Sequence, residues 1–130
     1  HPDYRERVLQ ATEDDTVFLE ELFDIGWPKA PHRVLHNRTV AAWEAAGRPT
    51  SGKRPGEGDV VATSKSRGPI ARYRPYTPAA DAEGDIDALA LYAGQSVALV
   101  HKRQPTAEIV REIVGEAEAI LLRLARQLGS

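Results

Sequence analysis

The sequence contains no cysteine and no methionine, and it has no apolar run near the length that spans a membrane. Without cysteine, disulfide bonds and thiolate chemistry are excluded, and this absence mildly favours a cytoplasmic location. A membrane helix needs roughly 18 consecutive apolar residues, so we expect no membrane segment. The chain begins His1-Pro2-Asp3, and its opening residues do not show the basic-then-apolar pattern of a signal sequence. We therefore expect it to be processed, trimmed or recorded from an internal start, as the tail of a longer protein.

Charge is nearly balanced over the whole chain but not along it. The 130 residues carry 17 basic and 19 acidic side chains, a net charge of −2, which argues against a generic nucleic-acid binder. Residues 13–24 hold six acids and no base, whereas residues 48–76 hold seven bases against two acids. We expect the basic stretch to make an intramolecular or subunit contact rather than to bind an anion or a nucleic acid.

Hydrophobic periodicity and turn residues predict a helix-rich α+β chain. Residues 1–104 are expected to form a small α+β domain with a flexible loop at about 48–80, and residues 105–130 a long amphipathic helix. The elements expected in the domain are a helix over 3–13, a strand over 16–19, a loop over 26–31, a helix over 38–46 with Asn37 as its N-cap, short strands over 59–63 and 70–73, and a helix over 85–92. Residues 96–100 fit either a strand or a continuation of the last of these helices.

The terminal helix has the clearest pattern in the chain. Apolar residues recur at helical spacing over residues 106–128, which is about six turns. They are Ile109, Val110, Ile113, Val114, Ala117, Ile120, Leu121, Leu124 and Leu128. Pro105 and Thr106 suit its start and Gly129 its end. Each large side chain of the stripe gains about 1.5–3 kcal/mol on burial, so we expect the isolated chain to dimerise or oligomerise through this helix.

Two other motifs are weak. His32 and His36 are four residues apart, but Pro31 and the N-cap Asn37 indicate extended backbone there, and no thiolate ligand or HExxH motif is present. We therefore expect no metal site. The glycine-rich segment 52–58 lacks the GxxxxGK[ST] order of a phosphate-binding loop, so a solvated loop is favoured.

The segment from Tyr92 to Ser96 combines polar side chains with a small-residue turn. Gly94 would let backbone approach a ligand closely, and the amide of Gln95 both donates and accepts hydrogen bonds. On the residues alone, a helix C-cap with Tyr92 in the core is the favoured interpretation, and the edge of a pocket is the alternative.

Several segments together resemble the C-terminal third of the nitronate monooxygenases, formerly called 2-nitropropane dioxygenases, and most closely the actinobacterial members. The matching segments are 1–5 (HPDYR), 15–17 (DTV), 31–37 (PHRVLHN), 92–97 (YAGQSV) and the helix over 105–128, which opens PTAEIV. Their order and spacing hold over essentially all 130 residues. No single segment is specific, but AGQS followed by a short apolar run and an AEIV-type helix is distinctive in combination.

The resemblance implies an FMN-dependent TIM-barrel oxygenase with a smaller added domain. A barrel needs roughly 200 residues or more, so this chain would hold the added domain and terminal helix, with the barrel absent. The phosphate-binding segment and the catalytic histidine base would lie upstream, which leaves the catalytic residues unknown here. The residues expected near flavin and substrate are Tyr92, Gly94, Gln95 and Ser96.

The parent reaction implied by the resemblance oxidises an alkyl nitronate with O₂ to a carbonyl compound and nitrite. The 130-residue chain alone is expected to be inactive and to bind no FMN, and its expected partner is the missing barrel or a second copy. No nucleic-acid or membrane partner is expected. Two alternatives stay open: part of a related FMN enoyl reductase, and a stand-alone helical interaction or oligomerisation module without catalysis.

Overall fold

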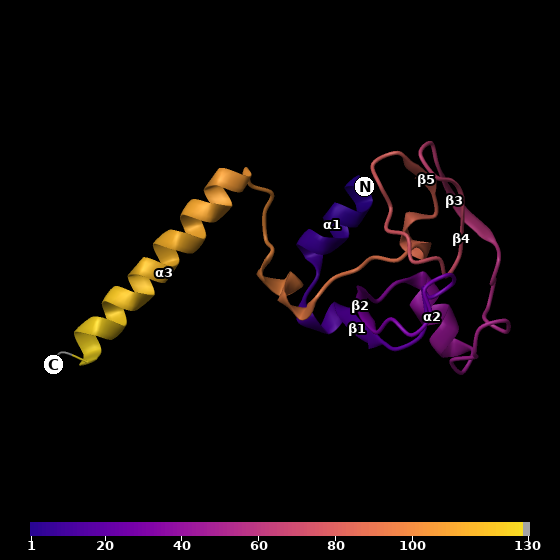
Figure 1. Cartoon of the computed structure of the whole chain (residues 1–130), viewed down its shortest axis with the longest axis horizontal. Coiled ribbons are helices and arrows are strands. Elements are labelled where there is room, and N and C mark those ends of the chain that lie inside the picture. Colours follow the sequence, from indigo (N-terminus) through magenta and orange to yellow (C-terminus); the bar gives the residue numbers. More distant parts are fainter. Residues whose placement is uncertain (129–130) are drawn as a thin grey trace.

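The computed structural model describes residues 1–128, and it is a small α+β domain followed by a projecting helix (Figure 1). The helices are α1 (Pro2–Gln10), α2 (Arg38–Ala45) and α3 (Thr106–Leu128). The strands are β1 (Thr16–Leu19), β2 (His32–Leu35), β3 (Val60–Ser64), β4 (Gly68–Ala71) and β5 (Ala82–Gly84). Three short 3₁₀ turns join them: η1 (Glu13–Asp15), η2 (Ile86–Ala88) and η3 (Gln95–Leu99).

The strands form two separate antiparallel sheets. One consists of β1 and β2, with Thr16 opposite Leu35 and Leu19 opposite His32. The other has the order β4-β3-β5, and its register shifts between Val60 and Ala62. Each sheet is too small to enclose a core alone, so both pack against helices and loops.

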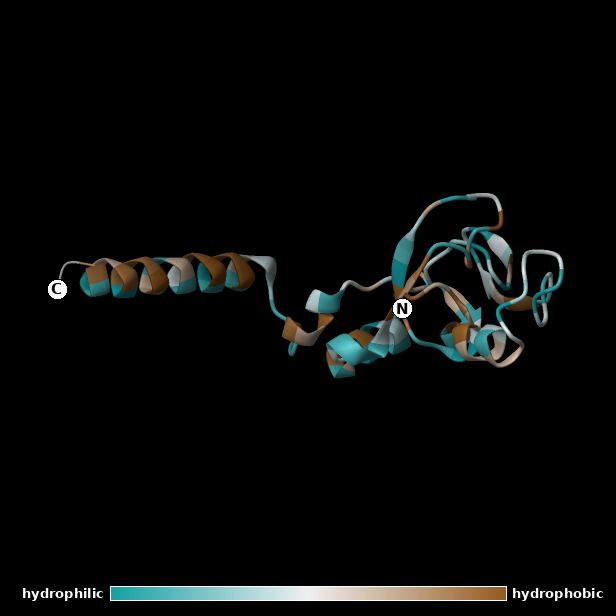
Figure 2. Cartoon of the chain, turned by 90° about the horizontal axis from the view of Figure 1, so that it is seen from below, coloured by the Kyte–Doolittle hydropathy of each residue, from teal (hydrophilic) through white to brown (hydrophobic). Residues whose placement is uncertain are grey.

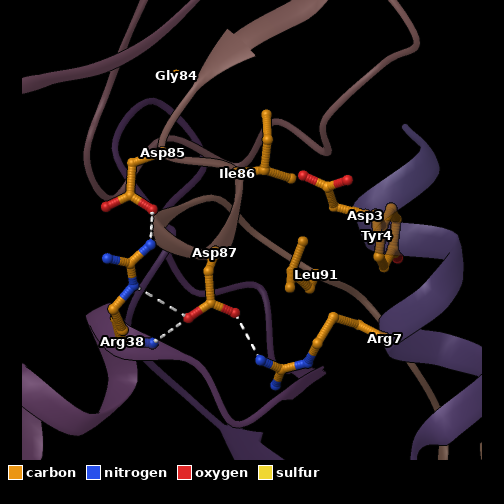
Figure 3. Close-up of a pocket in the computed structure, with 9 residues that line it drawn as sticks. All are labelled: Asp3, Tyr4, Arg7, Arg38, Gly84, Asp85, Ile86, Asp87 and Leu91. Atoms are coloured by element: carbon orange, nitrogen blue, oxygen red, sulfur yellow. Dashed lines mark hydrogen bonds and ion pairs between the residues drawn. The ribbon is translucent and has the colours of Figure 1, made fainter.

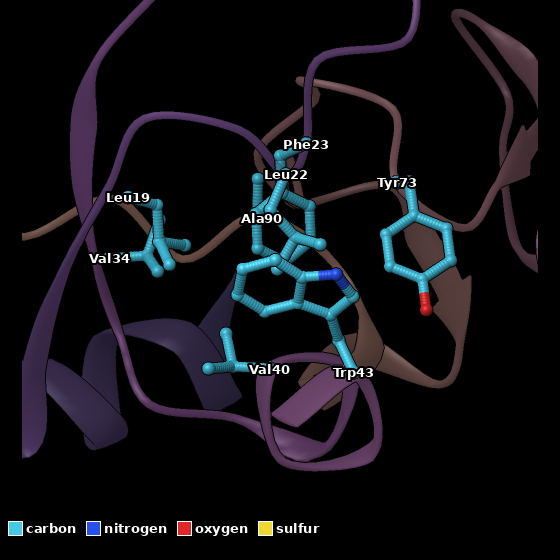
Figure 4. Close-up of a cluster of buried hydrophobic side chains, with 8 residues drawn as sticks. All are labelled: Leu19, Leu22, Phe23, Val34, Val40, Trp43, Tyr73 and Ala90. Atoms are coloured by element: carbon cyan, nitrogen blue, oxygen red, sulfur yellow. The ribbon is translucent and has the colours of Figure 1, made fainter. Parts of the chain in front are cut away.

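The main core lies between the β1-β2 sheet and α2 (Figure 4). Its buried members are Leu19, Leu22, Phe23, Val34, Val40, Trp43, Tyr73 and Ala90. Helix α2 starts where the Asn37 side chain accepts the Val40 N–H at 3.0 Å, which satisfies one of the unpaired amides of the first turn. The helix then turns Val40 and Trp43 inward. The indole N–H of Trp43 donates to the carbonyl of Pro49 at 2.9 Å, so the largest core side chain leaves no unpaired polar atom.

Most elements expected in the first 75 residues are confirmed. The strand over 16–19, the helix after Asn37 and the two short strands are present with small shifts in their ends. His32 and His36 do lie on and just after an extended segment rather than on a helix. Within the range 48–80 the structure places both β3 and β4, together with the buried side chains of Arg54 and Tyr73.

The prediction of a helix over residues 85–92 is wrong. Only η2 is helical there, and the following residues run extended beside β2, where the Leu35 N–H donates to the Leu91 carbonyl at 2.8 Å. Residues 88–91 are all buried. A continuous apolar run of this kind suits an extended segment covered on both faces better than an amphipathic helix. Residues 96–100, for which strand and helix were both open, are largely the 3₁₀ turn η3.

Helix α3 is confirmed from Thr106 to Leu128, and no residue in it is buried. The expected end at Gly129 lies outside the described residues. In Figure 2 hydrophobic residues recur along the whole helix, which projects away from the rest of the domain. The domain over residues 1–104 therefore leaves the stripe uncovered. Within residues 1–128, no helix is long and apolar enough to cross a membrane.

The acidic and basic segments meet inside the molecule, as the charge pattern predicts. Arg54 forms a two-pronged ion pair with Asp24, with nitrogen–oxygen distances of 2.5 and 3.0 Å. The Arg54 side chain is fully buried and also stacks over the ring of Tyr73, with 5.4 Å to the centroid. The hydrogen bond from Arg54 lowers the pKa of Asp24, although burial opposes this.

Replacing Arg54 by Met should be the most damaging single change to a charge in this domain. It leaves the Asp24 carboxylate largely buried without its partner, which typically costs about 3–5 kcal/mol. Arg48→Met is the control, since it removes an exposed pair with Glu44 and should cost about 1 kcal/mol or less. Urea unfolding followed by circular dichroism measures both. Adding Asp24→Asn to Arg54→Met should restore part of the loss, and equal losses in the two single Arg variants would contradict the buried role.

Stability should fall in acid because of the same carboxylate. An unfolded Asp has a pKa of about 3.9, and the folded pKa of Asp24 is lower. The stabilisation is therefore present above about pH 4 and is lost as the pH falls through the folded pKa. Asp81, whose pKa the Ser66 N–H and the Ser64 hydroxyl lower to about 2, loses its contribution in the same window. Free energies of unfolding measured from pH 6 to pH 2 should show the fall, and Asp24→Asn should make it shallower.

Candidate functional site

The residues expected near a ligand lie along the outer side of β2. Tyr92 pairs with Val34 in an isolated bridge, and the Ala93 N–H donates to the carbonyl of Arg33 at 3.2 Å. Tyr92 is half-buried, whereas Gly94, Gln95 and Ser96 are exposed. The four residues are thus neighbours in the chain, and the structure does not gather their side chains into one pocket.

Gly94 does not have the role expected of it. Its φ of −81° is ordinary for any residue, and a Cβ there would lie 3.6 Å from the Ser96 hydroxyl, a normal van der Waals distance. The position therefore neither requires glycine nor brings backbone unusually close to another group. The expected helix C-cap is also absent, because Gly94 precedes the turn η3 rather than following a helix.

Tyr92 instead packs against His32, a pairing that the sequence analysis missed. The two rings meet edge to face with centroids 5.4 Å apart, and His32 has a second edge contact with Phe23 at 6.3 Å. His32 Nδ1 lies 2.8 Å from the carbonyl oxygen of Ala30. A carbonyl only accepts, so Nδ1 carries the proton and Nε2 of the neutral ring is an acceptor.

The polar ends of both rings are buried without partners. The Tyr92 hydroxyl and His32 Nε2 have no hydrogen-bond partner within residues 1–128. Burial raises the pKa of the Tyr92 phenol, so this group stays a donor at neutral pH. The two contacting rings thus carry a donor and an acceptor that have no bond to protein. Such orphaned groups are uncommon in folded proteins and are candidates for binding water or a ligand.

Two strained residues lie next to this pair. Leu22 and Phe23 have φ values of 124° and 46°, although neither is glycine and both are fully buried. Each such conformation costs about 1–3 kcal/mol and persists only where the surroundings enforce it. Both side chains are held in the main core, and Phe23 also contacts His32. We call His32, Tyr92 and Phe23 the His32–Tyr92 cluster.

Tyr4 of α1 completes the surroundings of this cluster. Its hydroxyl donates to the backbone carbonyl of Tyr92 at 2.5 Å. Burial is the larger cause of the raised pKa of Tyr4, and the neighbouring Tyr92 adds to it. The bond fixes the backbone of Tyr92 from the side opposite β2, across 88 residues of sequence. No sequence spacing links these two tyrosines, so only the fold reveals the contact.

A separate cavity of about 360 Å³ lies between α1, the start of α2 and the turn η2 (Figure 3). Asp87 is its central charge and accepts hydrogen bonds from Arg7 at 2.7 Å and from the backbone N–H of Arg38 at 3.1 Å. The guanidinium of Arg38 also pairs with Asp85. Because these cations and carboxylates already satisfy one another, the cavity is best explained as a junction that joins α1 to α2.

The residues expected near the flavin are not gathered into a cavity. Gln95 and Ser96 are exposed, Gly94 makes no close approach, and η3 is a five-residue 3₁₀ turn rather than a helix whose N-terminus holds phosphate. None of these three residues lines the cavity beside Asp87. No group of three or more His, Asp or Glu side chains in residues 1–128 is arranged to hold a metal ion.

Comparisons with known proteins add no identification. No family model, no curated protein and no solved structure matches the chain. The likeness to nitronate monooxygenases therefore stays an expectation from the sequence segments quoted above.

The orphaned hydroxyl gives a direct test of the His32–Tyr92 cluster. Tyr92→Phe removes a buried polar atom that has no partner, so the free energy of unfolding should stay the same or rise slightly. Tyr4→Phe is the matched control. It removes a hydroxyl that is bonded to the Tyr92 carbonyl and should cost about 0.5–1.5 kcal/mol. Urea unfolding of both variants measures this, and a larger loss for Tyr92→Phe than for Tyr4→Phe would mean that its hydroxyl is already paired.

Proposed function

We propose that this chain is the C-terminal portion of an FMN-dependent nitronate monooxygenase, a cytoplasmic TIM-barrel enzyme whose barrel lies upstream of His1. The order and spacing of the matching segments over essentially the whole chain support this proposal. The implied reaction converts an alkyl nitronate and O₂ to a carbonyl compound and nitrite. FMN, when bound by the barrel, supplies the redox chemistry.

One observation carries the proposal: three matching segments, distant in sequence, meet at or next to a fourth, the segment 31–37 that contains β2. Segment 15–17 overlaps β1 and pairs with β2, which lies in segment 31–37. Segment 92–97 begins on the other side of β2 with the Val34–Tyr92 bridge. Segment 1–5 contributes Tyr4, which donates to the Tyr92 carbonyl. The proposal takes these segments to be parts of one functional surface.

The role proposed for this chain is to present that surface rather than to hold the cofactor. In this proposal the barrel provides the phosphate site and the catalytic base, as the resemblance implies. The His32–Tyr92 cluster offers a donor and an acceptor without protein partners. The exposed side chains of Gln95 and Ser96 follow directly after it. We propose that this part of the domain faces the flavin and substrate side of the barrel.

Two other functions remain as alternatives. A related FMN enoyl reductase would share the cofactor and barrel but not the substrate. A stand-alone interaction module without catalysis is favoured by one specific observation, the uncovered apolar stripe of α3. The reading frame upstream of His1 separates the stand-alone module from the two enzymes, because a barrel pattern there would exclude the module.

The 130-residue chain alone should bind FMN weakly or not at all, because the barrel strands and phosphate segment are not part of it. Quenching of FMN fluorescence on titration with the purified chain measures this. The chain extended upstream by its reading frame is the positive control and should be yellow when purified. Micromolar or tighter binding by the 130-residue chain would show that the cofactor site is placed wrongly.

Enzymatic turnover of the longer protein, which includes the upstream reading frame, tests the proposed function in a second way. Tyr92→Phe and Gln95→Ala should lower kcat/KM for an alkyl nitronate by up to about tenfold, which corresponds to the loss of one hydrogen bond. Lys65→Ala, on the exposed β3–β4 turn, serves as the control and should not change it. Unchanged kinetics in both site variants would remove this segment from the active site.

A further inference from the structure

The stripe of α3 is long, exposed and symmetric about the middle of the helix. The 23 residues span about 35 Å at 1.5 Å per residue. Ile113 and Leu121, which are 62% and 66% exposed, lie four residues on either side of Ala117. Val114 and Ile120 lie three residues on either side of it, and Val110 and Leu124 lie seven. A helix with this pattern presents the same apolar spacing in both directions along its axis.

The charges of α3 are not symmetric in the same way. Residues 106–118 carry four acids, Glu108, Glu112, Glu116 and Glu118, against Arg111 alone. Residues 119–128 carry Arg123 and Arg126 and no acid. The first half is therefore negative and the second half positive.

We infer that α3 pairs side by side and antiparallel with α3 of a second copy of this chain, centred on Ala117. In that arrangement the acidic half of each helix lies along the basic half of the other. The two helix dipoles point in opposite directions, which is also favourable. A parallel pair would set acid against acid and base against base. Ala117 has a small side chain, so the two helices can approach closely at the centre of the stripe. The interface is two-fold symmetric, with Ile113 of one copy opposite Leu121 of the other.

Two other occupants of the stripe, the linker before α3 and a membrane surface, fit less well. In the linker before α3, the Gln104 amide donates to the Glu112 carboxylate at 2.7 Å, and the Lys102 ammonium lies 3.5 Å from the same carboxylate. Ile109 and Ile113, near Glu112 on the helix, nevertheless stay exposed. Within residues 1–128, the chain therefore does not cover the helix. A helix that lies on a membrane has a polar face rich in Lys and Arg, whereas α3 carries four acids against three arginines. The inference does not depend on the proposed monooxygenase function, because it uses α3 alone.

Analytical ultracentrifugation of the 130-residue chain tests the pairing. The wild type should be a dimer at tens of micromolar. Arg123→Glu with Arg126→Glu makes both halves of α3 acidic and should raise the dissociation constant at least tenfold at low salt. Lys65→Glu with Arg67→Glu changes the total charge equally on the exposed β3–β4 turn and should leave the constant unchanged. These variants keep the apolar stripe, and circular dichroism checks that the domain still folds.

A complementary variant separates specific pairing from general repulsion. Glu108→Lys with Glu116→Lys makes both halves basic and should also weaken self-association. An equimolar mixture of the acidic and basic variants should restore a dimer. A monomeric wild type, or charge variants that dimerise like the wild type, would overturn the inference.

Orientation is tested by cysteine substitution, which is clean because the chain has no cysteine of its own. In the antiparallel pair, Ile113→Cys and Leu121→Cys should form a disulfide only when the two variants are mixed. A disulfide formed readily by either variant alone would indicate parallel helices and overturn the arrangement, as would the absence of any disulfide in the mixture. Binding of the wild type to anionic vesicles in place of dimerisation would assign the stripe to a membrane surface instead.

Discussion

The side chain of Asn37 holds the domain together at the point where its parts meet. Its oxygen accepts the Val40 N–H and so starts α2, while its nitrogen donates to the Leu89 carbonyl at 2.7 Å. Two residues further on, the Thr39 hydroxyl donates to the carbonyl of Ala88 at 2.8 Å. Two buried carbonyls are thereby satisfied without a helix, and this allows residues 89–93 to run extended beside β2. The β1-β2 sheet, the main core and the position of Tyr92 all depend on that arrangement.

This dependence explains which parts of the fold the sequence could predict. Helix α2 and strand β1 are specified by local features, a cap and a run of β-branched residues, and both are found where expected. Helix α3 repeats its apolar spacing for 23 residues, and no tertiary contact is needed to recognise it. Residues 85–92 have helical spacing as well. There, the side chains of Asn37 and Thr39, about 50 residues upstream, supply the deciding bonds, and no local pattern encodes them.

The candidate site was predictable only in part, for a similar reason. Tyr92 was selected by its neighbours in sequence, but the structure shows that its important neighbours are His32 and Tyr4. These lie 60 and 88 residues away, and the side chains meet because both edges of β2 are paired. Gly94 was selected for a backbone freedom that its φ of −81° does not use. Composition and spacing can thus suggest the segment, but the pairing of strands decides which side chains meet.

The ion pair between Arg54 and Asp24 has a consequence for the topology of the chain. It joins residues 30 positions apart and so closes a loop that contains β2 and α2. Many small proteins close such loops with a disulfide, which lowers the entropy of the unfolded chain permanently. An ion pair acts only in the folded state, so the unfolded chain keeps its full freedom and the loop must be closed anew each time the domain folds. In a chain without cysteine, this closure is reversible by protons rather than by reductants, and acid can open the loop under conditions in which a disulfide would stay intact.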